Sequence, residues 1–302
     1  MNTRVTAGVF LLATLTGCAN GLSSGSVPDR IVAERGGFVP EGIEYDNNRN
    51  RFLAGSFADG TIYEVTSSGR LVPAITSPDL NASIGIEVDE SRDTLYVANS
   101  NTQIPNGAAE LGIYNLATGE QLAMIDLAAS IQDRPADASH FANDVAVSKA
   151  GVAYVTDSRM KIVYKVDKYY RASVLIDFGL DAEFGLNGIE YNPAGYLILA
   201  SPGTGQLIRV PVDNPQRWAL IGLDFGVDGI VWTSDGSLAG VSNNRSRAVK
   251  YRSDDDWRTA RLTGMASYSG QSTMGAVVGD EVYVVQPDFS DDALPEILRA
   301  KF

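Results

Sequence analysis

The sequence predicts an all-β fold, a six-bladed β-propeller whose blades are four-stranded antiparallel sheets. Three observations lead to this prediction: one type of segment recurs six times, its period is that of propeller blades, and apolar residues alternate as in strands. Each segment opens on a polar or small residue, turns on Asn, Asp, Gly or Ser, and rises in a second strand. Successive starts lie 43, 59, 44, 41 and 45 residues apart, a spacing typical of blades.

The six segments supply the first two strands of each blade. They are EGIEYDNNRNRFLAGS (41–56), IGIEVDESRDTLYVANS (84–100), NDVAVSKAGVAYVTDS (143–158), NGIEYNPAGYLILASP (187–202), DGIVWTSDGSLAGVSN (228–243) and TMGAVVGDEVYVVQP (273–287).

Third strands follow, and both chain ends are strand-like. The third strands are TIYEV (61–65), LGIYNL (111–116), KIVYKV (161–166), QLIRVPV (206–212) and RAVKYR (247–252). Residues 30–38 and 296–302 can each complete the last blade, and the sequence does not choose between them. The 59-residue interval between the starts at Ile84 and Asn143 predicts an insertion at 131–140, as a loop or short helix. Six blades around one axis make a single domain, residues 29–302.

The first residues resemble a bacterial lipoprotein signal. Arg4 precedes an apolar run that is too short to span a bilayer, and Leu-Thr-Gly-Cys ends at Cys18, the only cysteine. The resemblance implies a signal peptide at 1–17, acylation of Cys18 and a Ser/Gly-rich, lipid-anchored tether at 18–28. Ala19 after the cysteine favours the outer membrane or a periplasm-facing location. The alternative is a soluble secreted protein.

Charge excludes several classes of partner. The chain has 37 acidic against 24 basic side chains, a net charge of −13, and no basic cluster. Such a surface repels nucleic acid and anionic lipid. A small-molecule substrate is expected, with membrane contact through the lipid anchor only, and the sequence predicts no oligomeric state.

Aligning the segments on their first residue brings four polar positions together. Innermost strands line the axial channel of a propeller, so equivalent positions of different blades meet around it. The aligned residues are Glu41, Ile84, Asn143, Asn187, Asp228 and Thr273. Asn and Asp before glycine are also ordinary turn residues, but four at one register favour a metal site.

Two carboxylates and two amides form an all-oxygen ligand set. Such ligands suit a hard cation, and Ca²⁺ is favoured, with Zn²⁺, Mn²⁺ or Mg²⁺ as alternatives. Without a cation, Glu41 and Asp228 would be like charges in a narrow channel, each raising the pKa of the other.

These motifs, from about residue 40 to 287, resemble those of the senescence-marker-protein/gluconolactonase (regucalcin-like) family, related to diisopropylfluorophosphatases and paraoxonases. The resemblance implies a divalent ion in the central channel, held by Glu41, Asn143, Asn187 and Asp228, and hydrolysis of lactones, esters or phosphoesters.

Two departures from these families limit the prediction. Sugar-lactonase members carry an arginine where this chain has Phe141, so aldonolactone specificity is not implied, and Phe141 is expected to line a substrate pocket. Paraoxonase-like catalysis uses two histidines, whereas this chain has only His140. His140 is a candidate proton shuttle at the channel mouth, or a solvated loop residue. Asp157 and Ser158 are expected on the opposite rim, in structural roles.

Together these features predict a metal-dependent lactonase or esterase. The cation polarises the substrate carbonyl and activates a water, while Asp228 acts as general base or as nucleophile. The alternative is a non-catalytic, calcium-stabilised propeller that binds a ligand or protein at the cell envelope.

The ligand assignment predicts different effects at two glutamates of one strand. Glu41→Gln should weaken Ca²⁺ binding because it removes a charged ligand, whereas Glu44→Gln should be tolerated. Isothermal titration of both variants with Ca²⁺ checks this, and equal losses of affinity would contradict the register.

Overall fold

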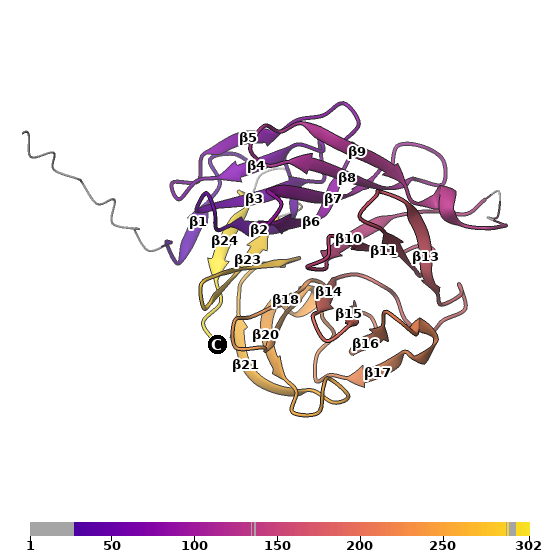
Figure 1. The fold of residues 1–302 in the computed structure, drawn as a ribbon. Helices are drawn as coiled ribbons and strands as arrows, with labels where there is room; N and C mark the ends of the chain where they lie inside the picture. The colour runs from indigo at the N-terminus through magenta and orange to yellow at the C-terminus, as the bar shows by residue number, and fades with distance from the viewer. Residues whose placement is uncertain (1–26, 134, 136, 288, 290–293) are drawn as a thin grey trace, which may run out of the picture.

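The structure, a computed structural model, describes residues 27–133, 135, 137–287, 289 and 294–302. In this part of the chain six four-stranded antiparallel sheets surround a central axis (Figure 1). The predicted fold class is therefore confirmed. The predicted signal peptide, Cys18 and most of the tether lie outside the described residues.

Five blades run in chain order from the axis outwards. Blade 1 contains β2 (Pro40–Asp46), β3 (Arg51–Ser56), β4 (Ile62–Val65) and β5 (Leu71–Ile75). Blade 2 contains β6 (Ser83–Asp89), β7 (Thr94–Ser100), β8 (Ala109–Asn115) and β9 (Gln121–Asp126). Blade 3 contains β10 (Ala142–Val147), β11 (Ala153–Asp157), β12 (Ile162–Val166) and β13 (Ala172–Asp177).

The second half of the ring repeats this order. Blade 4 contains β14 (Ile189–Asn192), β15 (Tyr196–Ser201), β16 (Gln206–Pro211) and β17 (Ala219–Gly222). Blade 5 contains β18 (Ile230–Trp232), β19 (Leu238–Ser242), β20 (Arg247–Arg252) and β21 (Arg261–Ser267). Three short 3₁₀ turns, η1 (Ala128–Ser130), η2 (Pro215–Arg217) and η3 (Asn243–Arg245), lie between strands.

Both chain ends build blade 6. Its sheet order is β22 (Gly275–Val278), β23 (Glu281–Gln286), β24 (Glu296–Arg299) and β1 (Arg30–Val32). Arg30 pairs with Leu298 and Val32 with Glu296, so the N-terminal strand is the outer edge of the last blade. The sequence left open which end completes the blade, and the structure uses both.

The apolar core is divided among the blade interfaces. Each of six clusters of buried side chains joins one blade to the next. Second strands are covered on both faces by neighbouring blades, and every residue of β7, β15 and β19 is buried. This explains their nearly continuous apolar sequences. The outer strands β9, β17 and β21 contain exposed residues.

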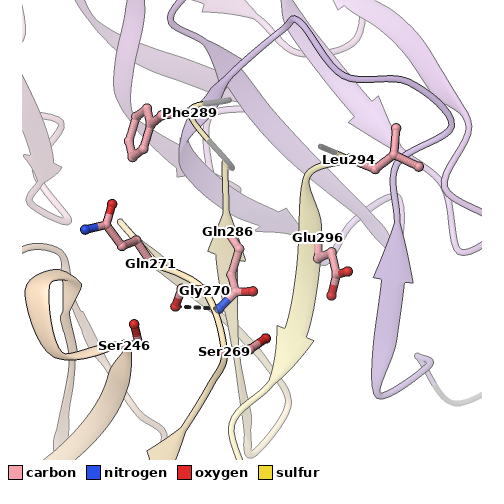
Figure 2. Close-up of a pocket in the computed structure, with 8 residues that line it drawn as sticks. All are labelled: Ser246, Ser269, Gly270, Gln271, Gln286, Phe289, Leu294 and Glu296. Carbon is pink, nitrogen blue, oxygen red and sulfur yellow. Dashed lines mark hydrogen bonds between the residues drawn. The ribbon is translucent and has the colours of Figure 1, made fainter. Parts of the chain in front are cut away.

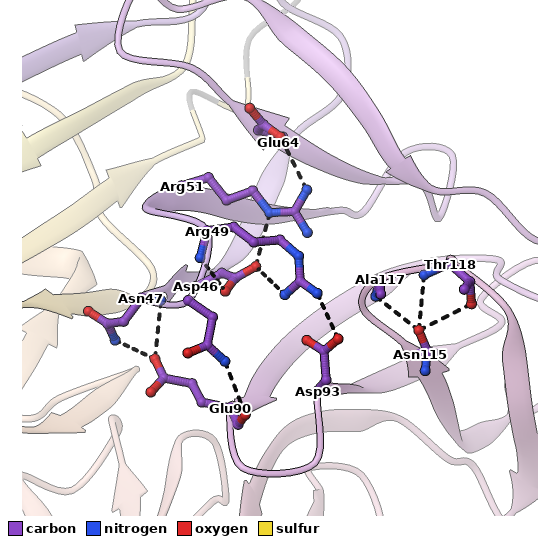
Figure 3. Close-up of polar contacts among 11 residues, drawn as sticks. Asp46, Asn47, Arg49, Arg51, Glu64, Glu90, Asp93, Asn115, Ala117 and Thr118 are labelled. Atoms are coloured by element: carbon purple, nitrogen blue, oxygen red, sulfur yellow. Dashed lines mark hydrogen bonds and ion pairs between the residues drawn. The ribbon is translucent and has the colours of Figure 1, made fainter. Parts of the chain in front are cut away.

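Polar contacts join blades 1 and 2 at the end of β2 farthest from Glu41 (Figure 3). Asp46 is buried and accepts a hydrogen bond from the Arg49 guanidinium at 3.1 Å. Arg49 also donates to Asp93 of blade 2 at 2.7 Å, and the Asn47 N–H donates to Glu90 at 3.1 Å. A buried carboxylate requires such partners, so this network fixes the two blades at one rim.

The predicted insertion lies between β9 and β10. The turn η1 comes just before it, and the described residues of 131–140 are loop and turn. The expectation of a loop is therefore confirmed.

Closure of blade 6 by β1 predicts a stability effect at Ile31. This side chain is 2% exposed and packs in the cluster that contains Phe38, Tyr283 and Ile297. Ile31→Ala should lower the free energy of unfolding by about 2–4 kcal/mol, measured by urea denaturation. The control Leu122→Ala, at a side chain 41% exposed on β9, should change it by less than about 0.5 kcal/mol. Equal effects would argue against closure by β1.

Candidate functional site

The innermost strands depart from regular pairing at the register of the predicted ligands. In blades 1, 2 and 3 the pairing of the first two strands shifts at residues 41–42, 84–85 and 143–144. In blades 4 and 5 the residues at this register precede β14 and β18, although the sequence predicted that they begin the strands. Such bulges bend a strand and redirect side chains, here at the rim of the channel.

Adjacent inner strands approach closely at this level. A Cβ added to Gly42 would lie 2.2 Å from the carbonyl oxygen of Ile84, and one added to Gly188 would lie 2.7 Å from that of Asp228. The Gly188 N–H donates to this Asp228 oxygen at 3.0 Å. Glycine is therefore required here because only a residue without Cβ allows the backbones to meet.

Hydroxyl groups bridge further blades at the same level. Thr273 Oγ1 donates to the Glu41 carbonyl oxygen at 2.7 Å, which joins blade 6 to blade 1. Thr156 Oγ1 donates to the Asn187 carbonyl oxygen at 2.7 Å, which joins blade 3 to blade 4. The backbones of Glu41, Asn187 and Asp228 thus take part in contacts between neighbouring blades at this level.

Asp228 is held by two amide groups. Its Oδ1 accepts a hydrogen bond from Asn187 Nδ2 at 2.5 Å, and its Oδ2 accepts one from Asn243 Nδ2 at 3.3 Å. Burial raises the pKa of Asp228 to about 6, against the lowering effect of these two hydrogen bonds. The carboxylate is thus fixed in place and ionised above this pH. Sequence reasoning did not identify Asn243.

Glu41 faces other acidic groups. Burial raises its pKa well above the usual range, and the charges of Asp228 and Asp144 raise it further. The effect of Asp228 on the pKa of Glu41 indicates that the two predicted carboxylate ligands lie near each other. The two groups gain from a shared cation because it would remove their repulsion.

Asp144 is a channel residue that sequence reasoning missed. It is 2% exposed, and its Oδ2 accepts the Ile189 N–H at 2.9 Å. Its Oδ1 has no hydrogen-bond partner within the described residues, and burial raises its pKa to about 7. Asp144 takes the place that glycine occupies after Glu41, Asn187 and Asp228. This exchange was the signal that could have revealed it.

Three further glutamates form a lower acidic layer, which consists of Glu44, Glu87 and Glu190. Burial raises the pKa of Glu44 to about 8, and it raises those of Glu87 and Glu190 well above their usual range. The charge of Asp144 also raises the pKa of each of these three glutamates. The motif Gly-Ile-Glu, repeated three times, encodes this layer.

The bulge explains why residues 41 and 44 share the channel. Residues three apart point to opposite faces of a regular strand, which would direct Glu44 away from Glu41. One extra residue at positions 41–42 reverses the alternation. At neutral pH Glu44 is mainly protonated, with a shape close to that of glutamine, which supports the predicted tolerance of Glu44→Gln.

The predicted ligands Glu41, Asn143, Asn187 and Asp228, called the upper ring below, offer oxygen atoms that suit a hard divalent cation. The neighbouring charges that shift the pKa values of Glu41 and Asp144 are acidic ones, and they raise both values. Asn143 is buried, and no hydrogen bond occupies its side chain within the described residues. In the same part of the chain no three His, Cys, Asp or Glu side chains form a metal-binding group. A cation would therefore need the amide oxygens of Asn143 and Asn187 beside the two carboxylates.

His140 is buried in blade 3. Its side chain is 3% exposed, so the alternative of a solvated loop residue is wrong. Its Nδ1 lies 3.0 Å from Asp157 Oδ2, and its Nε2 has no partner among the described residues. Asp157 pairs with Ala142, which puts it on the same rim as the candidate ligands and corrects the predicted opposite rim. The proton-shuttle role of His140 stays a prediction.

Phe141 lies half-buried at this rim beneath a guanidinium. Arg159, which is exposed, lies over the Phe141 ring at 5.6 Å and donates to Ser139 Oγ at 3.1 Å. A guanidinium from the turn after β11 thus lies beside position 141. Sequence reasoning missed it because the two residues are 18 positions apart.

Solved structures match this fold, whereas no protein-family model and no curated protein matches the chain. A calcium-binding regucalcin from Agrobacterium tumefaciens matches with a TM-score of 0.62 and 17% identity, over 91% of this chain and 95% of that one. A gluconolactonase from Xanthomonas campestris matches with a TM-score of 0.63 and 14% identity, over 88% of each chain. Virginiamycin B lyase from Staphylococcus aureus matches with a TM-score of 0.61 and 9% identity, over 87% and 81%.

These identities establish a shared fold. The resemblance to gluconolactonase and regucalcin noted in the sequence is confirmed at the level of architecture, and a lyase shares it. Among the described residues, no helix has the length and apolar character needed to cross a membrane.

The lower acidic layer predicts a pH-dependent stability of the metal-free protein. Folded Glu44 keeps its proton up to about pH 8, whereas the unfolded chain releases it near 4.5. Since the unfolded state then binds fewer protons, the free energy of unfolding should fall as pH rises from about 4.5 to about 8. Urea denaturation in EDTA at several pH values measures this slope.

Glu44→Gln should reduce that slope because glutamine does not ionise. The matched control Glu120→Gln, at an exposed turn, should leave it unchanged. A Glu44→Gln slope equal to that of the wild type would contradict the raised pKa.

Proposed function

We propose that the protein is a metal-dependent hydrolase of lactones or esters, with its reaction site at the mouth of the central channel. Ca²⁺ is the favoured ion, and Zn²⁺, Mn²⁺ or Mg²⁺ are alternatives. The observation that supports this most is that the carboxylates of Glu41 and Asp228 lie near each other beside amide side chains. Among the described residues, no basic group shifts the pKa of either carboxylate.

A divalent cation bound by these oxygens would polarise a substrate carbonyl and lower the pKa of a bound water. The protein's own contribution is then the position and charge of its side chains. Asp228 is ionised above about pH 6 and fixed by Asn187 and Asn243. It is the best-placed general base for the attacking water, with direct nucleophilic attack as the alternative.

The surrounding backbone keeps this geometry rigid. Asn187 and Asp228 are joined through both their side chains and the Gly188 N–H, so neither can move without the other. Such preorganisation avoids reorganisation during the reaction.

Phe141 supplies an apolar surface at the same rim for a small-molecule substrate.

We also propose that the enzyme acts at the cell envelope as an exported lipoprotein, anchored through Cys18 to the outer membrane or facing the periplasm. The support is the signal-like sequence before Ala19. Labelling with a radioactive fatty acid should mark the wild type and not Cys18→Ala.

The alternative function is a non-catalytic propeller that Ca²⁺ stabilises and that binds a ligand or protein. The same uncompensated carboxylates favour it, since a cation there would stabilise the fold whether or not chemistry follows. A fall in melting temperature on chelation, without turnover of any tested substrate, would favour this alternative.

The hydrolase proposal predicts a loss of activity when either the metal or the base is removed. On a panel of lactones and aryl esters, EDTA should abolish turnover and Ca²⁺ should restore it. Asp228→Asn should lower kcat by about 10²-fold or more because it removes the base and one charged ligand. Steady-state kinetics measures both effects.

The control is Glu120→Gln, far from the channel mouth at an exposed turn, which should keep wild-type kcat. Product analysis in ¹⁸O-labelled water separates hydrolysis from elimination, because only hydrolysis transfers the label to the acid. Turnover that neither EDTA nor Asp228→Asn changes would exclude the proposed mechanism.

A further inference from the structure

Two arginines lie over one aromatic ring on the blade 5 side of the channel mouth. The guanidinium carbons of Arg245 and Arg247 lie 5.5 Å and 5.3 Å from the centre of the Phe225 ring. Arg245 is the last residue of the turn η3, and Arg247 is the first residue of β20. The face of an aromatic ring attracts guanidinium groups, so Phe225 keeps both positive charges in one place.

The turn η3 and the segment before β18 place this pair beside Asp228. Asn243, two residues before Arg245 in the same turn, donates to the Asp228 carboxylate. Phe225 precedes Asp228 by three residues, so their Cα atoms lie at most about 11 Å apart. The Tyr251 hydroxyl accepts the Phe225 N–H at 3.1 Å. The ring is therefore anchored close to the candidate general base.

The strand order of blade 5 brings Arg247 to the same rim. Arg247 pairs with Ser242, the last residue of β19. The carbonyl oxygen of the preceding residue, Val241, accepts the Asp228 N–H at 2.7 Å. Asp228 and Arg247 therefore flank the same end of β19, one on each side of it.

Both guanidinium groups lie on the side of β20 that faces blade 4. Val249 and Tyr251, which alternate with Arg247 along the strand, pack in the apolar cluster between blades 4 and 5. Ala248 packs in the cluster between blades 5 and 6. Ser246, between the two arginines in the sequence, lines a cavity on the blade 6 side (Figure 2). The strand itself thus separates the arginine pair from blade 6.

Neither arginine has an acidic partner within the described part of the chain. Arg245 is exposed, and the side chain of half-buried Arg247 donates to Met265 Sδ at 3.6 Å. Asp224, next to Phe225, is exposed and forms no ion pair with either arginine. The described ion pairs of blades 4 and 5 join other residues, namely Arg209–Asp256, Lys250–Asp235 and Arg261–Asp254.

An anion would be stabilised between the two guanidinium groups. Two positive charges at one ring repel each other, and a shared negative group removes that repulsion. Arginine presents its N–H groups as a fork that matches the oxygen atoms of a carboxylate or a phosphate. The chain has a net charge of −13, so this pair is a local exception that would attract an anionic ligand to one side of the mouth.

We propose that Arg245 and Arg247 bind an anionic oxygen group, a carboxylate or a phosphate, of a substrate whose reacting carbonyl lies at Asp228. This inference rests on the proposed hydrolase function and adds a substrate class to it. The substrates are lactones or esters that carry an acid group on a side chain, several bonds away from the reacting carbonyl.

The test measures binding separately from turnover. The probes are two γ-butyrolactams, which are not readily hydrolysed. One carries a butanoate chain on its α-carbon, and the other carries the matching uncharged butanamide. Isothermal titration of the Ca²⁺-loaded wild type should show about 10-fold or tighter binding of the butanoate. A phosphonate in place of the carboxylate shows which anion is preferred, and a preference for either over the amide supports the site.

The variants separate the arginines from the cation as the group that holds the anion. Arg245→Gln/Arg247→Gln should remove the preference for the butanoate and leave the affinity for the butanamide unchanged. Because Arg245 is exposed, Arg245→Gln alone should fold and should weaken butanoate binding by about 3-fold or more. A preference that persists in the double variant would assign the anion to the cation and would overturn the proposal.

The matched control is Arg70→Gln/Arg171→Gln. It removes the same two charges at exposed positions in the turns that follow β4 and β12, on the opposite rim. This control should bind both probes as the wild type does. An equal loss of butanoate binding in the control would attribute the effect to net charge and would contradict a site at Arg245 and Arg247.

The lactone counterparts of both probes then test the chemistry. A preference lost in the arginine variants, without hydrolysis of either lactone by the wild type, would support the anion site and refute the proposed hydrolase function. Hydrolysis of both lactones with equal kcat/KM, together with equal affinity for the two lactams, would overturn the anion site and leave the hydrolase function standing.

Discussion

The close approach of the inner strands is the constraint on which the rest of the structure depends. Gly42 and Gly188 meet the backbone of the next blade at distances that exclude a side chain. Because these glycines follow Glu41 and Asn187, the same contact that closes the ring brings polar groups to the axis. Separation of the strands by even one methyl group would widen the mouth and remove the geometry of the site.

This constraint also concentrates negative charge, and the channel deals with it at two levels. In the lower layer burial favours protonation, as the pKa of about 8 for Glu44 indicates. In the upper ring two amide hydrogen bonds oppose burial, and Asp228 has a pKa of about 6. Asp228 is therefore the carboxylate at this level that is mainly ionised at neutral pH, which suits a cation and a base. In the lower layer Glu44 is mainly protonated at this pH.

The sequence was sufficient for the fold and for the register of Glu41 and Asp228, because repeats turn a pattern into spatial equivalence. It did not predict that Glu44 lies in the channel with Glu41. Side chains alternate between the two faces of a strand only where no bulge intervenes. The prediction that Asp157 lies on the opposite rim was wrong. Asp157 ends the second strand of blade 3, and in an antiparallel pair the end of the second strand lies beside the start of the first. Contacts between distant turns, such as Arg159 over Phe141, have no sequence signal.

The mouth of the channel is asymmetric, because different side chains surround it on its different sides. Arg159 and Phe141 lie on the blade 3 side, whereas a cavity lined by Ser269 and Gln286 lies between blades 5 and 6. The turns that carry these residues differ from blade to blade, while the inner ring repeats. The two sides therefore differ in chemistry, with a guanidinium over an aromatic ring on one and hydroxyl and amide groups on the other. Exchanging turns could change the substrate without disturbing the ring, because the ring is fixed by backbone contacts that the turns do not supply.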